Sequence, residues 1–190
     1  MKFDQEHNIH FENVDENYEH MDILEAINNE AFPSSEKCSI AYLVGIPDLS
    51  QLHVNAIVDG DVPVGFIIWV DLCEGFSYLS YLAIDSHYRN RRYGSKALTS
   101  LFDNVLTDTV SFGVIEALDP DAQNSEQRVT RKRFYERLGF TVFENTVEFY
   151  GNDRYHLVYH GPETTEEVLL EKFGLLLEFL KKHIVSQSAY

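Results

Sequence analysis

The sequence has few cysteines, few cations and no long apolar run, and each shortage excludes a class of protein. Two cysteines occur among 190 residues. Cys38 and Cys73 form no C-x-x-C pair, so we expect free thiols in a reducing compartment rather than a disulfide framework or a thiolate metal site. No segment approaches the roughly 18 consecutive apolar residues of a membrane span. The acidic first twenty residues also lack the apolar core of a signal peptide, which favours a cytoplasmic protein.

Positive charge is scarce and unevenly placed along the chain. There are 15 Lys and Arg against 31 Asp and Glu, a formal net charge of -16. Such a charge repels nucleic acid and anionic membranes, so we expect neither as a partner. Nine of the 15 basic residues lie within residues 89–137, whereas residues 1–88 hold two basic and 16 acidic residues. This concentration favours an anion site there, the alternative being that the cations offset neighbouring acids on solvated helix faces.

Hydrophobic periodicity predicts one mixed domain of the α/β or α+β class. Hydrophobic residues make up 44% of the chain, enough for the core of a domain of ordinary size. Two apolar runs flank Asp59-Gly60-Asp61, which predicts a β-hairpin, and the run Phe76–Ile84 extends it. Apolar spacing predicts a helix around residues 98–105. Further strands are expected at Ile9–Val14, Val110–Leu118, Phe140–Phe149 and Tyr155–Tyr159, and further helices at Met21–Ala31 and Asn124–Leu138.

The end of the sequence predicts an additional helix. We expect residues 1–162 to form the main domain and residues 163–190 to form this helix. Thr164, with Glu167 three positions later, indicates a capping box at its start. Apolar residues cover more than one narrow stripe, so the helix either packs across the domain or forms a homodimer interface. Gly174 in its middle favours close packing, because glycine lowers helix propensity.

An arginine-rich loop separates a strand from a helix between residues 78 and 96. It contains Arg89, Asn90, Arg91 and Arg92. Backbone N–H groups at a helix start are unpaired and carry partial positive charge, and arginine forks add charge-assisted hydrogen bonds to phosphate oxygens. Gly94 lets a ligand approach the backbone closely, and Ser95 can add a hydroxyl donor. The segment therefore favours a phosphate ligand, with pyrophosphate the expected one.

Two motifs resemble those of the GCN5-related N-acetyltransferase (GNAT) family. The segment YLAIDSHYRNRRYGSKAL is similar to the family's acetyl-CoA signature, Gln/Arg-x-x-Gly-x-Gly/Ala, with Arg89 at its first position and Gly94 at its last. Arg92 stands where the family has its middle glycine. The segment RKRFYERLGF (Arg131–Phe140) resembles the family's second motif, in which an aromatic-tyrosine pair precedes glycine and phenylalanine at a helix end.

This resemblance implies a fold and a cofactor. The fold is a single GNAT-type domain whose central, mostly antiparallel twisted sheet opens in a V between its fourth and fifth strands and is flanked by helices. Acetyl-CoA is then the acyl donor. The backbone of Leu82, Ala83 and Ile84 would bind its pantetheine arm, and the loop Arg89–Ser95, including Tyr93, would hold its pyrophosphate. Asn124 would contact the cofactor or only cap its helix, and Arg131 is a further candidate on that helix.

The resemblance also implies how the reaction is catalysed. Tyr135 matches the tyrosine that protonates the departing thiolate, and an ordinary pKa near 10 keeps it protonated at neutral pH. Its alternative role is a buried aromatic beside Phe134. Glu116, in an otherwise apolar strand, is the candidate base, because burial would raise its pKa. Its alternative is a sheet-edge carboxylate paired with an arginine of the following helix. Glu36 would select a cationic substrate, unless it is solvated surface.

We therefore expect an acetyl-CoA-dependent N-acetyltransferase that acts on a primary amine. The acidic first 88 residues favour a small cationic acceptor molecule. The spacing of His, Cys and carboxylate residues predicts no metal site. Two alternatives stay open: a regulatory module that binds acyl-CoA without catalysis, and an acetyltransferase of protein N-termini or lysines.

Overall fold

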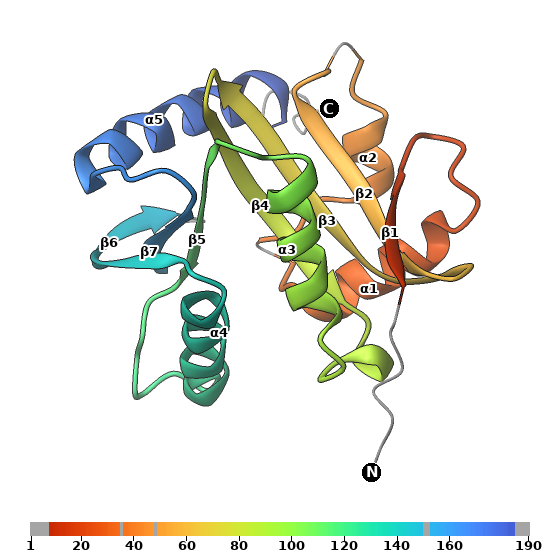
Figure 1. Cartoon of the computed structure of the whole chain (residues 1–190), viewed down its shortest axis with the longest axis horizontal. Coiled ribbons are helices and arrows are strands. Elements are labelled where there is room, and N and C mark those ends of the chain that lie inside the picture. The colour runs from red at the N-terminus through yellow and green to blue at the C-terminus, as the bar shows by residue number, and fades with distance from the viewer. Residues whose placement is uncertain (1–7, 35, 48, 150–152, 185–190) are drawn as a thin grey trace. The chain divides into compact units, whose positions relative to one another are not determined.

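A computed structural model describes residues 8–34, 36–47, 49–149 and 153–184, and it contains a seven-stranded sheet in the order β1-β2-β3-β4-β5-β7-β6 (Figure 1). The strands are β1 (Ile9–Asn13), β2 (Leu52–Asp59), β3 (Val62–Cys73), β4 (Phe76–Ile84), β5 (Val110–Glu116), β6 (Thr141–Phe149) and β7 (Asp153–His160). The helices are α1 (Met21–Ala31), α2 (Ile40–Val44), α3 (Tyr93–Asn104), α4 (Ser125–Arg137) and α5 (Glu166–His183), with a 3₁₀ turn η1 at Ser86–Tyr88.

The expected fold class is confirmed. The sheet is mostly antiparallel, and β4 and β5 form a parallel pair within it. Their ladder covers three residue pairs, from Phe76 with Val110 to Tyr78 with Phe112. Cys38 and Cys73 are both free thiols, as expected. Among the described residues, no helix is long and apolar enough to cross a membrane.

The chain divides into two compact units, which are described separately. The first consists of the described residues up to Trp69 together with Ser80–Leu101. β2 and β3 are joined at Gly60, whose φ of +64° is the left-handed conformation that a tight hairpin turn needs, so the predicted hairpin is confirmed. α3 lies in front of β3 and β4 (Figure 1) and buries Leu98.

The connection between α1 and α2 is held by a carboxylate of α1. Glu25 accepts hydrogen bonds from the Ser39 hydroxyl (2.7 Å) and the Ala41 backbone N–H (3.0 Å), so it supports the start of α2. Ser39 is itself the N-cap of α2 and accepts from the Tyr42 N–H. Asn28 of α1 donates to the Cys38 carbonyl over 2.8 Å. The turn before α2 is therefore fixed to α1 by side-chain hydrogen bonds.

The second unit contains Val70–Leu79 and the described residues from Phe102 onward. Its core joins α5 to the strands: Leu169, Phe173 and Leu176 pack in one cluster with Phe112 and Leu157. β6 pairs with β7 through an irregular register between Val142 and Thr146. The proposed division at residue 162 stays a prediction, and residues 1–7 and 185–190 of the two expected segments lie outside the described part of the chain.

One expectation about the start of α5 is wrong. Its N-cap is Thr165 rather than Thr164, and the Thr165 side chain accepts a hydrogen bond from the Val168 N–H (3.4 Å). The register of a capping box can slip by one residue when two threonines are adjacent. A Cβ atom added at Gly174 would meet no atom within 4 Å, so this glycine is not closely packed within the chain.

Candidate functional site

The loop between β4 and α3 adopts the glycine-like backbone that the signature motif requires. Asn90 and Arg92 have positive φ angles of 63° and 66°. Asn tolerates this left-handed region, but for Arg it costs on the order of 1 kcal/mol. Arg92 therefore occupies a position whose backbone conformation favours glycine, which explains why the family has glycine there. Asp85 starts the loop by accepting a hydrogen bond from the His87 backbone N–H (2.8 Å).

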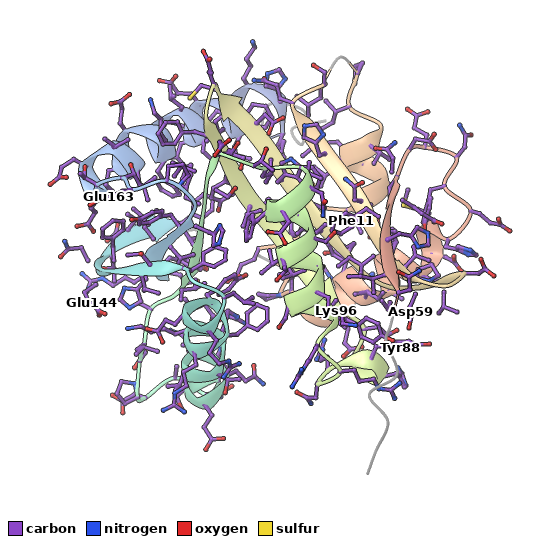
Figure 2. The ribbon with its side chains drawn as sticks, viewed as in Figure 1. Phe11, Asp59, Tyr88, Lys96, Glu144 and Glu163 are labelled. Atoms are coloured by element: carbon purple, nitrogen blue, oxygen red, sulfur yellow. The ribbon has the colours of Figure 1, made fainter. Side chains whose placement is uncertain are left out.

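A buried tyrosine anchors the start of α3. Tyr93 is buried, and its hydroxyl donates a 2.5 Å hydrogen bond to Asp59 at the end of β2. Burial and this bond to Asp59 raise the pKa of Tyr93 to about 12. Tyr88 contacts the Tyr93 ring edge to face, and Figure 2 labels Tyr88, Asp59 and Lys96 near this helix start. Asp59 was expected only as a turn residue, so sequence reasoning missed its anchoring role.

Backbone and side chains of this loop together have the charge and the position that an anion requires. The Lys96 N–H bonds to the Arg92 carbonyl (2.9 Å) and closes the first turn of α3. The N–H groups of Tyr93, Gly94 and Ser95 precede that turn, where a helix offers no acceptor of its own. An oxyanion of a phosphate or pyrophosphate fits such a position.

The arginines of the loop differ in how far carboxylates neutralise them. Arg89 donates from Nε to the Ile84 carbonyl (3.0 Å) and lies 3.4 Å from Glu30 of α1. Arg91 lies over the Tyr88 ring at 5.6 Å. In the described part of the chain, neither Arg91 nor Arg92 forms an ion pair. Two exposed guanidinium groups therefore stay available to an anion, whereas Arg89 is shared with Glu30.

The strand residues before the loop and Glu36 also belong to the first unit. Ala83 is buried, and Leu82 and Ile84 are half-buried. An added Cβ at Gly65 of β3 would lie 2.3 Å from the Ala83 carbonyl oxygen, so the two strands are in close contact there. Glu36 lies in the turn between α1 and α2, and its backbone carbonyl accepts a 2.7 Å hydrogen bond from Tyr81. Their roles in binding stay predictions.

In the second unit, Glu116 is the centre of an ion-pair cluster. Asn124 donates to one carboxylate oxygen over 2.8 Å, and Arg128 lies 3.3 Å from the same oxygen. Arg131 donates to the other oxygen. Arg128 also donates to the Ala117 carbonyl and to the Asn124 side chain, both over 2.8 Å. The cluster therefore joins the end of β5 to the first two turns of α4.

The expected rise in the pKa of Glu116 is wrong. Burial acts to raise this pKa, but the hydrogen bonds from Asn124 and Arg131 and the adjacent guanidinium charges outweigh it and hold it below the ordinary value. A carboxylate stabilised in this way binds a proton weakly. The structure thus favours the alternative, a carboxylate paired with arginines of the following helix. Asn124 is the N-cap residue by position, but its side chain makes no capping hydrogen bond. Its amide group donates to the Glu116 carboxylate instead.

Tyr135 lies on α4, close to the end of the helix. Its ring contacts Phe140 at 4.9 Å and Phe134 at 5.2 Å, both edge to face. Among the described residues, nothing hydrogen-bonds to the Tyr135 hydroxyl. Burial raises the pKa of Tyr135, and the Arg131 charge acts in the opposite direction. The hydroxyl is therefore protonated at neutral pH and has its hydrogen free to donate.

Two histidines of β7 were missed by the sequence analysis. His156 is 6% exposed, and its Nδ1 has no hydrogen-bond partner among the described groups. His160 stacks on Phe102 at 4.1 Å and contacts Phe140 at 5.4 Å. Burial lowers the pKa of His160, which keeps its ring neutral. Alternation within the run Tyr155–Tyr159 was the available signal, but it does not distinguish a core histidine from a functional one. No group of three or more potential metal ligands is found in the ranges described.

The candidate residues thus fall into two sets. The first unit brings together residues 82–84, the loop 89–95 and the helix start, and the second brings together Glu116, Asn124, Arg131 and the helix that carries Tyr135.

Comparison with known proteins gives one family. Residues 50–142 match the sequence profile of the acetyltransferase (GNAT) domain. None of the curated protein sequences matches the chain. A solved protein from Bacteroides thetaiotaomicron assigned to the GNAT acetyltransferases is 25% identical, with a TM-score of 0.70 over 87% of this chain and 95% of that one.

Two further solved structures share the fold at lower identity. An aminoglycoside 6'-N-acetyltransferase in complex with coenzyme A is 18% identical, with a TM-score of 0.62 over 82% of this chain and 99% of that one. The ribosomal-protein-S18-alanine N-acetyltransferase from Escherichia coli is 14% identical, with a TM-score of 0.60 over 84% and 98% of the respective chains.

Proposed function

The chain belongs to the GNAT family of acetyl-CoA-dependent N-acetyltransferases, and from that premise we propose that its acceptor is a primary amine of a small cationic molecule. The support for a cationic acceptor is the charge of the chain, with 16 acidic and two basic residues in the first 88. An acidic surface attracts an ammonium ion and repels other anions. The structural neighbours include an aminoglycoside 6'-N-acetyltransferase and a ribosomal-protein-alanine N-acetyltransferase, so both classes of acceptor belong in the test.

The loop at the start of α3 is proposed to hold the pyrophosphate of acetyl-CoA. The single observation that carries this assignment is the left-handed backbone of Asn90 and Arg92, which leads directly into the N-terminal turn of α3, the helix end that suits an anion. The exposed guanidinium groups of Arg91 and Arg92 supply charge, each contact with a phosphate oxygen being worth about 1.5–3 kcal/mol. Leu82, Ala83 and Ile84 contribute backbone groups to the pantetheine arm in this proposal.

Tyr135 is proposed as the general acid. The amine nitrogen bonds to the thioester carbonyl carbon, the C–S bond breaks, and the sulfur leaves with the Tyr135 hydroxyl proton. Solvent then reprotonates the tyrosinate, and the proton lost by the amine goes to solvent. The unpaired, protonated hydroxyl described above supports this role. Glu116 is assigned no proton transfer, because its carboxylate is paired with Arg128 and Arg131.

Two experiments test the proposal. Thiol release from acetyl-CoA is measured with diamines, aminoglycosides and peptides bearing free N-termini. Tyr135→Phe should lower kcat by about 10²-fold or more while leaving the affinity for acetyl-CoA unchanged. The control is Tyr159→Phe, which keeps the 5.7 Å stacking on Phe143 and should keep full kcat. Unchanged kcat in Tyr135→Phe would exclude it as the acid, and turnover only with peptides would exclude a small-molecule acceptor.

Cofactor binding is tested separately by calorimetry. Arg91→Ala should weaken coenzyme A binding by about tenfold, because it removes one charge-assisted contact. Arg133→Ala on α4 is the matched control, since this arginine is exposed and makes no ion pair among the described groups. Equal affinity of the Arg91→Ala variant and the wild type would show that the pyrophosphate binds elsewhere.

A further inference from the structure

α5 has an exposed face that the rest of its unit does not cover. The buried face of the helix is Leu169, Phe173 and Leu176, which pack in the core of the second unit. The opposite stripe is exposed and repeats at helical spacing. One line along this face runs through Glu167, Leu170, Gly174, Glu178 and Lys181, beside the exposed Glu171, Leu175 and Lys182. We refer to the first five of these residues as the α5 stripe.

Gly174 at the centre of the stripe is not packed against any other element in the described part of the chain. A Cβ there would meet nothing within 4 Å, and its backbone is not among the positive-φ glycines. Glycine is the weakest helix former after proline, so this position disfavours the helix without a compensating contact. A glycine in an exposed helix face does allow a second backbone to approach closely, which a larger side chain would prevent.

A two-fold rotation places opposite charges of two copies of the stripe against each other. If two copies of α5 lie antiparallel and cross at Gly174, residues equally distant from that glycine face each other. Glu167 of one copy then lies opposite Lys181 of the other, and this happens twice. Leu170 lies along the stem of Glu178 of the second copy. A parallel pair would place Glu167 opposite Glu167 and Lys181 opposite Lys181, which is repulsive.

We propose that two copies of this chain associate through the α5 stripe as an antiparallel, two-fold symmetric helix pair. Within the described ranges no carboxylate pairs with Lys181, so this ammonium group is available to the second copy. An 18-residue helix is about 27 Å long, and a single helix pair buries less than the roughly 800 Å² per partner of a stable complex. The chain's net charge of -16 also opposes association. The dimer therefore dissociates on dilution.

Charge reversal tests the arrangement. Sedimentation velocity of the full chain over a wide concentration range should show a reversible monomer–dimer equilibrium. Glu167→Lys alone, or Lys181→Glu alone, makes both facing pairs repulsive and should weaken dimerisation by about tenfold or more. The double variant carrying both changes should dimerise like the wild type. An equimolar mixture of the two single variants should form a heterodimer, because each chain then supplies the charge that the other lacks.

Controls separate association from folding. Glu19→Lys, in the first unit, makes the same change in net charge at an exposed site and should leave dimerisation unaltered. Gly174→Leu should weaken the dimer while keeping or increasing the helical circular dichroism signal, because leucine is a better helix former. A wild type that is monomeric at every concentration would overturn the proposal. A dimer that the single reversals do not weaken, or that the double variant does not restore, would overturn it as well.

Discussion

Replacing Glu116 with glutamine tests whether charge, rather than apolar packing, holds α4 in place. No residue of α4 is fully buried. Among the described residues, polar contacts attach the helix at two places. Its first turns carry the Glu116 cluster and the Arg128 hydrogen bond to the Ala117 carbonyl, and Lys132 forms a 2.9 Å ion pair with Glu144 of β6, which Figure 2 labels. Glu116→Gln keeps the size of the side chain and removes its charge, so Arg128 and Arg131 lose their common partner.

The expected loss of stability follows from how exposed the Glu116, Arg128 and Arg131 side chains are. The Glu116 side chain is 16% exposed, and those of Arg128 and Arg131 are 20% and 40% exposed. Breaking a fully buried ion pair costs about 3–5 kcal/mol, and an exposed pair is worth at most about 1 kcal/mol. For this half-buried cluster we expect Glu116→Gln to lower the free energy of unfolding by about 2 kcal/mol. In a chain of this size, that loss lowers the melting temperature by roughly 4–8 °C.

The pH dependence has a definite sign. The pKa of Glu116 is lower in the folded chain than in the unfolded chain. Its stabilising contribution is therefore fully present above the unfolded value of about 4.3, and it is lost as the pH falls through the lower folded value. The difference in stability between the wild type and Glu116→Gln should be constant near neutral pH and should shrink in this acidic range.

Hydrogen exchange and thermal unfolding together measure the effect. Glu116→Gln should increase amide exchange within residues 125–137 more than elsewhere, because the helix loses both ion pairs with Glu116. Glu144→Gln is the matched control: it removes a carboxylate that pairs with the same helix, but its side chain is 77% exposed, so no measurable change is expected. If the two variants behave alike, or if α4 keeps its protection in Glu116→Gln, the reasoning is refuted.

Three further predictions concern single residues. Arg92→Gly should melt roughly 2–4 °C above Arg92→Ala in a thermal scan, because only glycine relieves the φ of +66°; equal melting temperatures would contradict this. Gly65→Ala should lower the unfolding free energy in urea by about 1–3 kcal/mol, since the new Cβ meets the Ala83 carbonyl at 2.3 Å, and wild-type stability would disprove that contact. Burial beside Phe102 lowers the pKa of His160, so its contribution is present above the ordinary pKa of about 6.5 and is lost on acidification. His160→Phe should therefore lose less stability than the wild type between about pH 7.5 and about pH 5.5.

The sequence was sufficient for the elements whose signals are local. Alternating apolar runs and the turn at Gly60 predicted the β2–β3 hairpin, and Gly139, with a φ of +83°, ends α4 where the sequence indicates. The motif spacing predicted a strand, an arginine-rich loop and a helix in the correct order. Each of these signals involves neighbouring residues, so no long-range contact had to be known.

The candidate site could be predicted only in part, because contacts between residues far apart in the sequence leave no local sequence pattern. Glu116 was expected to be a base because it interrupts an apolar strand. Its pKa depends instead on Asn124 and Arg131, eight and fifteen positions later, which α4 brings to it. Asp59 bonds to Tyr93 across 34 positions and was read only as part of a turn. Neither interaction has a sequence signature.

The irregular register of β6 has a consequence for how the sheet ends. β6 is an outer strand of the sheet, so one side of it has no neighbouring strand. An outer strand with a regular ladder invites a strand of another molecule to add to it, which is a route to aggregation. The register shift between Val142 and Thr146 makes this strand irregular, and the exposed charge of Glu144 lies within the shifted segment. In contrast to the proposed α5 interface, the free edge of β6 is therefore poorly suited to pairing with a strand of another molecule.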